Sequence, residues 1–128
     1  MNDEQYLNHC RELLVSFADT FSRRTATLEQ DNPLRELAQE FSLLALGEGP
    51  ALYDNAAALI TRLFTNYPDF APTLPRELLW FVAGDCLHYM PDEEIALYQQ
   101  LDEMRATAAS RGDLLDLAAA KAKLLKLQ

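Results

Sequence analysis

Cysteine, histidine and long apolar runs are scarce in this chain, and these shortages limit the classes of protein to which it can belong. Two cysteines, Cys10 and Cys86, are too few for a disulfide framework, so we expect a reducing compartment. The longest uninterrupted apolar run, Leu78 to Ala83, is far shorter than the ~20 residues that a membrane-spanning helix needs. The first residues, Met1 to Glu4, show neither the basic region nor the apolar core of a signal peptide. We therefore expect a cytoplasmic protein that does not bind membranes.

Basic residues are also outnumbered. The chain has 20 Asp and Glu against 11 Lys and Arg, which gives a formal net charge of −9 at pH 7. Because capture of a phosphate backbone needs clustered Lys and Arg, nucleic acid is not an expected partner. The charge is uneven: residues 1–110 hold 18 acids and 7 bases, whereas residues 111–128 hold 2 acids and 4 bases. All three lysines lie in the last eight residues, where the dipole of a helix C-terminus favours cations.

Apolar residues recur at helical spacing along most of the chain, and no long segment alternates with period two, as a strand would. Asn32 followed by Pro33 is typical of an N-cap and a first helical residue. Gly112 is suited to ending a helix, and Asp113 can cap the next one. The spacing predicts helices at about residues 3–23, 33–46, 50–66, 75–89, 91–110 and 113–126.

These elements predict an all-α fold, a compact bundle of five to six helices that forms a single domain over residues 1–128. The segment from 75 to 89 is apolar nearly all round in its first two turns, which predicts a buried central helix. We expect this helix to be held between the 3–23 and 91–110 helices. Aromatic residues at helical spacing are more typical of a core than of a ligand pocket. Those expected in the core are Phe17, Phe21, Phe41, Phe64, Trp80, Phe81, Tyr89 and Tyr98.

Residues 78–98 contain a Gly-Asp-Cys-Leu-His block followed by Pro-Asp-Glu-Glu. With this block the chain resembles, over most of its length, small uncharacterised bacterial proteins, and the resemblance implies no activity. Over residues 78–108 the chain is also similar to one tetratricopeptide repeat, since Trp80, Gly84 and Ala96 have the spacing of its signature positions. That similarity implies a helical hairpin in which glycine lets the second helix approach the first. The pattern does not recur 34 residues earlier, so we expect a single hairpin and no solenoid.

The histidines and cysteines are the first candidates for chemistry. His9 and Cys10 are adjacent, so on a helix they point about 100° apart. Cys86 and His88 are two residues apart and point to nearly opposite sides. Because a tetrahedral zinc site needs converging ligands, we expect no metal. The same divergence argues against Cys86 as a nucleophile with His88 as its base.

Asp85 and His88 are three residues apart and would share one face of a helix, where a carboxylate can orient an imidazole. The sequence offers no second converging acid, base or nucleophile, so a structural polar pair is the simpler interpretation. A phosphate-binding loop is also unsupported, because Leu52 stands where the dinucleotide fingerprint after Gly47 needs glycine. We therefore expect no cofactor and no catalytic residue, with Asp85, His88 and Cys86 kept as candidates.

The last helix is apolar on two sides. One stripe is expected to face the bundle, and the other, containing Leu117, Leu124 and Leu127, is expected to bind a partner. The leading hypothesis is a non-enzymatic protein–protein interaction or regulatory module, either a homodimer or an adaptor for another protein. The alternative is an enzyme or a small-ligand-binding protein with its site near Asp85 and His88. The stripe expected to face the bundle contains Leu114, Leu115, Ala118, Ala122 and Leu125.

Overall fold

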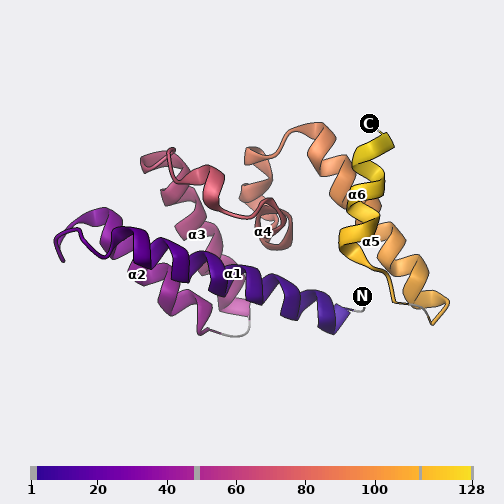
Figure 1. Cartoon of the computed structure of the whole chain (residues 1–128), viewed down its shortest axis with the longest axis horizontal. Helices are drawn as coiled ribbons and strands as arrows, with labels where there is room; N and C mark the ends of the chain where they lie inside the picture. Colours follow the sequence, from indigo (N-terminus) through magenta and orange to yellow (C-terminus); the bar gives the residue numbers. More distant parts are fainter. Residues whose placement is uncertain (1–2, 48–49, 113, 128) are drawn as a thin grey trace. The chain divides into compact units, whose positions relative to one another are not determined.

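The structure, a computed structural model, describes residues 3–47, 50–112 and 114–127 (Figure 1). These residues form six α-helices and two short 3₁₀ helices, with no strand among them, which confirms the all-α class. The expected helices at 3–23, 33–46, 50–66 and 91–110 agree with α1, α2, α3 and α5 to within two residues at each end. In chain order the elements are α1 (Asp3–Thr25), α2 (Pro33–Ala45), α3 (Pro50–Asn66), η1 (Ala71–Thr73), α4 (Arg76–Val82), η2 (Gly84–Tyr89), α5 (Asp92–Ser110) and α6 (Leu117–Leu127).

Packing divides the chain into two compact units. Unit 1 comprises Met1–His9 and His88–Gln128, and unit 2 comprises Cys10–Leu87. Helix α1 contributes to both, because its first turns belong to unit 1 and the rest to unit 2. No helix in the described ranges combines the length and the apolar character that crossing a bilayer requires.

Aromatic rings hold together the core of unit 2, where α1 runs alongside α2 (Figure 1). Phe17 and Phe21 of α1 stack with ring centroids 5.5 Å apart, and each meets Phe41 of α2 edge-on at 5.1 Å and 5.9 Å. Phe70, which lies outside the helices, meets Phe21 edge-on at 5.2 Å. Such pairs contribute about 0.5–1.5 kcal/mol each beyond the burial of their surface. The sequence pattern had identified the helical members of this cluster but not Phe70.

The start of α2 confirms the expected capping. The side-chain oxygen of Asn32 accepts a hydrogen bond of 2.9 Å from the backbone N–H of Leu34, and Pro33 is the first helical residue. Arg35 donates to the carbonyl of Leu28 at 2.6 Å, which attaches the preceding loop to the helix. The Asn32 bond satisfies one of the N–H groups that a helix start otherwise leaves without a partner.

The expected continuous helix over about 75–89 is wrong. Helix α4 ends at Val82, the chain then passes through Ala83 at φ 59°, and η2 begins at Gly84, whose φ is 56°. The break falls here because glycine costs about 1 kcal/mol inside a helix and adopts a positive φ without strain. Instead of a long central helix, α4 is a seven-residue helix that packs against α3.

Gly84 therefore does not have the close-packing role that the tetratricopeptide similarity implies. It lies outside α4, and a β-carbon added to it would meet no atom within 4 Å. A signature glycine in a repeat is needed where a second helix presses against it, and nothing presses against this one. Its requirement is conformational, since Gly84 itself has φ 56°.

Helices α5 and α6 lie side by side in unit 1 (Figure 1). Gly112 has φ 74° and follows the C-cap of α5, as expected for a glycine that ends a helix. Helix α6 starts later than expected, and its cap is Asp116, whose carboxylate accepts from the N–H of Ala119 at 3.1 Å. Asp113, the expected cap, lies outside the described residues.

On α6 the buried edge and the exposed edge are the reverse of those predicted from the sequence. Leu117 and Leu124 are buried, whereas Leu114 is 64% exposed and Leu125 is 51% exposed. Helix α6 begins at residue 117, which leaves Leu114 outside it. The stripe through Leu117 and Leu124 lies on the same side as Lys121, which binds Tyr98 of α5. Leu117 and Leu124 thus do not form the free partner-binding edge that we expected, and the side chain of Leu127 lies outside the described residues.

Two cations add to the packing of unit 1. Lys121 of α6 donates to the hydroxyl of buried Tyr98 on α5 at 2.9 Å. The guanidinium carbon of Arg105 on α5 lies 4.2 Å from the ring centroid of Tyr6, at the start of α1. These contacts attach α6 and the first turns of α1 to α5.

Candidate functional site

The candidate catalytic residues lie in or next to η2. Cys86 is fully buried and His88 is exposed, so the thiol and the imidazole face different surroundings. The side chain of Asp85 lies outside the described residues, and its pairing with His88 stays a prediction. Cys10 is also fully buried, beside a half-buried His9. Within the part of the chain that the structure describes, no three His, Cys, Asp or Glu side chains are grouped so that they could hold a metal ion.

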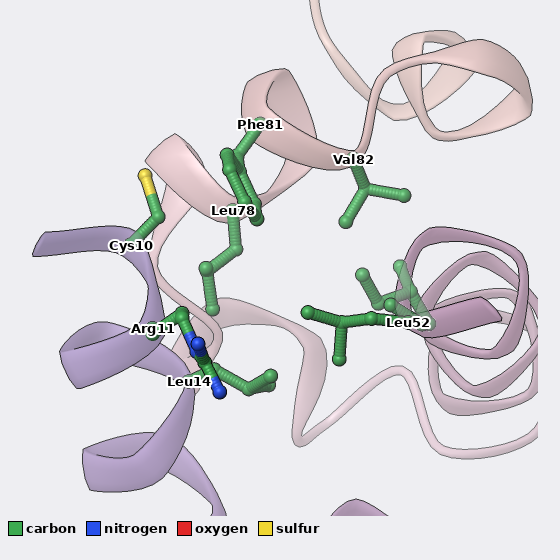
Figure 2. A pocket seen from close by; sticks show the side chains of 9 residues that line it. Cys10, Arg11, Leu14, Leu52, Leu78, Phe81 and Val82 are labelled. Atoms are coloured by element: carbon green, nitrogen blue, oxygen red, sulfur yellow. The ribbon is translucent and has the colours of Figure 1, made fainter. Parts of the chain in front are cut away.

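A small apolar void lies where α1, α3 and α4 of unit 2 meet (Figure 2). Leu78 and Val82 project from α4, and Leu52 projects from α3, into the same space (Figure 2). Its volume is about 10 Å³, which is close to the minimum for one water molecule, and an apolar lining gives water no partner. The void is therefore a packing defect of the core and no ligand site. Its lining comprises Cys10, Arg11, Leu14, Leu52, Ala56, Ile60, Leu78, Phe81 and Val82.

Arg11 connects this core to the turn that follows α2. Its guanidinium donates to the carbonyl of Gly47 at 3.1 Å. Gly47 in turn donates to the carbonyl of Leu44 at 2.9 Å. Arg11 thereby fixes the C-terminal end of α2 to α1, and with it one end of a larger groove.

That groove lies between α2 and α3 and has a volume of about 560 Å³. This is within the range of about 300–1,000 Å³ that binding pockets occupy. Buried leucines from both helices, Leu44, Leu52 and Leu59, contribute to its lining, while Leu43 is 70% exposed at its edge. The full lining comprises Glu40, Leu43, Leu44, Gly47, Leu52, Asn55, Ala58, Leu59 and Arg62.

Polar groups in the groove are few. Arg62 of α3 donates to the carboxylate of Glu40 on α2, and both side chains are nearly half exposed. A pair as exposed as this contributes little to stability. The pair joins α2 to α3 and forms a charged boundary of the groove, whose surface is otherwise largely apolar. Asn55 adds one exposed amide to the lining.

Sequence reasoning missed this groove. Helical spacing alone places Leu44 and Leu59 on the apolar stripes of their helices, and both are buried. The available signal was the pair of leucines that fall off the stripe of the second helix, Leu43 and Leu46. Both are strongly exposed, and an apolar residue outside a buried stripe is a mark of a partner surface when others lie near it.

The fold and the groove define an all-helical protein with an open, mainly apolar surface hollow. The chain belongs to the PA2817-like family, whose model matches residues 3–128. No curated protein and no solved structure matches it.

Proposed function

We propose that this protein is a non-enzymatic protein-interaction module that binds its partner in the groove between α2 and α3. The observation that carries the proposal is Leu43, which is 70% exposed beside a groove of about 560 Å³ lined by buried leucines. Burying a leucine fully is worth about 1.5–3 kcal/mol, so covering Leu43 and the surrounding surface would favour association.

The chemistry of the lining favours a protein over a small molecule. A small-molecule site has a small number of polar groups that are placed to bind and orient the ligand. Here Glu40 and Arg62 already bind each other, which leaves Asn55 as the other polar side chain of the lining. An open, mainly apolar groove between two helices is the kind of surface that receives the apolar face of an amphipathic helix.

A photo-crosslinking amino acid at position 43 tests the proposal in the native cell extract, with products identified by mass spectrometry. Val15 on α1 is a matched control, because it is also aliphatic and 50% exposed. We expect a discrete protein adduct from position 43 and none of the same mass from position 15. Absence of an adduct at position 43, or identical adducts at both positions, would contradict the proposal.

A second variant, Leu43→Glu, checks that the adduct reports binding. Since Leu43 is mostly exposed, the variant should keep its fold, as judged by circular dichroism. Placing a charge against a desolvated apolar surface should weaken partner binding by about 30-fold or more, the range of an interface hot spot. Unchanged affinity in the folded variant would mean that the partner binds elsewhere.

A further inference from the structure

Helix α6 carries a stripe of exposed apolar residues. Ala118 and Ala122 are exposed, and Leu125 is 51% exposed. These residues are spaced by four and three positions, so they lie on one side of the helix. Leu117 and Leu124 of the same helix are buried.

We propose that the groove between α2 and α3 receives this stripe of α6 from a second copy of the chain, an inference that rests on the proposed function. Leu125 is the large side chain that enters the groove, toward the buried Leu44 and Leu59. The two alanines let the backbone of α6 approach the groove closely. In the proposed dimer the apolar groove of one copy and the apolar α6 stripe of the other copy cover each other.

Charge favours the same pairing. The exposed charged side chains in the described parts of α2 and α3 are Glu36, Glu40 and Asp54 against Arg62, an excess of acid. On α6, Lys123 and Lys126 are exposed. At about 100° per residue, Lys126 flanks the stripe of Leu125, whereas Lys123 lies farther round the helix. Lys126 is therefore the lysine expected to meet the acids of α2 and α3, of which Glu40 lines the groove.

The proposed assembly is a two-fold symmetric dimer. In a two-fold dimer each copy supplies one α6 and one groove, so both copies cover both surfaces. An 11-residue helix makes a small contact by itself. The reciprocal arrangement doubles the buried area, toward the about 800 Å² per partner of a standard interface.

Sedimentation of the full chain over micromolar concentrations tests the inference. We expect a dimer, and we expect Leu125→Glu to raise its dissociation constant about 30-fold or more while the fold is retained. The matched control is Val15→Glu, which puts the same charge at a residue of similar exposure on α1 and should leave the dimer intact. A monomeric wild-type chain, or equal effects of the two variants, would overturn the inference.

The lysines provide a second comparison. Lys126→Glu should weaken the dimer more than Lys123→Glu, although both reverse one charge on α6. Adding Glu40→Lys to Lys126→Glu should recover affinity, because the opposite charges are then exchanged between the two surfaces. Equal loss from the two lysine variants, with no recovery, would contradict docking in this orientation.

Crosslinking separates failure of this inference from failure of the proposed function. Mixed copies with and without nitrogen-15 distinguish adducts between chains from those within one chain. Adducts from position 43 to residues 117–127 of another copy support the inference. Adducts to a different protein overturn it and leave the groove as a binding surface, whereas no adduct at all overturns both.

Discussion

Replacing Ala83 by glycine should stabilise the protein. Ala83 has φ 59° and ψ −149°, a backbone conformation that glycine alone adopts readily. The strain of a side chain there is about 1–3 kcal/mol, and Ala83→Gly removes it. Against this gain, the freer unfolded chain costs about 0.4–1 kcal/mol, and loss of a half-buried methyl group costs a few tenths, roughly half of the ~0.8 kcal/mol for full burial. The expected net gain is about 1 kcal/mol.

Urea unfolding of Ala83→Gly and of the unmodified chain measures this difference, and a thermal scan should show a melting temperature higher by about 3–6 °C. The control is Ala96→Gly, because Ala96 is exposed within α5 and the same substitution there should cost about 1 kcal/mol. The hydrogen bond from the N–H of Ala83 to Leu79, at 2.9 Å, is retained in the variant. If Ala83→Gly destabilises as much as Ala96→Gly does, Ala83 lies in a helix and the continuous helix over 75–89 is correct after all.

Substitutions at three further positions test single features. Gly84→Ala and Gly84→Leu should each cost about 1–2 kcal/mol in urea unfolding, because a positive φ strains any side chain and there is no close neighbour; a far larger loss for leucine would indicate overpacking. Asn32→Ala should cost about 1 kcal/mol through loss of the N-cap, and an unchanged melting temperature would show that the bond to Leu34 does not matter. His88→Gln should change stability by less than about 0.5 kcal/mol, because the imidazole is exposed, and a large loss would reveal a structural role for it.

Local chemistry is sufficient to determine most of the helices of this protein. Apolar residues recur at helical spacing through α1, α2, α3 and α5, and the ends of these helices follow from residues such as Asn32, Pro33 and Gly112. A cap or a glycine acts within a few residues of itself, so its effect is visible in the sequence. The buried leucines of the α2–α3 groove were predictable from their helical spacing, which is also a local feature of the sequence.

Tertiary structure alone decided where α4 ends and which side of α6 is buried. The apolar pattern continues across Ala83 and Gly84, so periodicity cannot locate the break; the conformation of these two residues does. On α6 both edges are apolar, and the choice of Leu117 and Leu124 over Leu125 depends on the helix start and on packing against α5. The groove likewise exists only because α2 and α3 lie together, leaving Leu43 outside their contact. Sequence patterns report the preferences of a single segment, whereas a groove is defined by the distance between two segments.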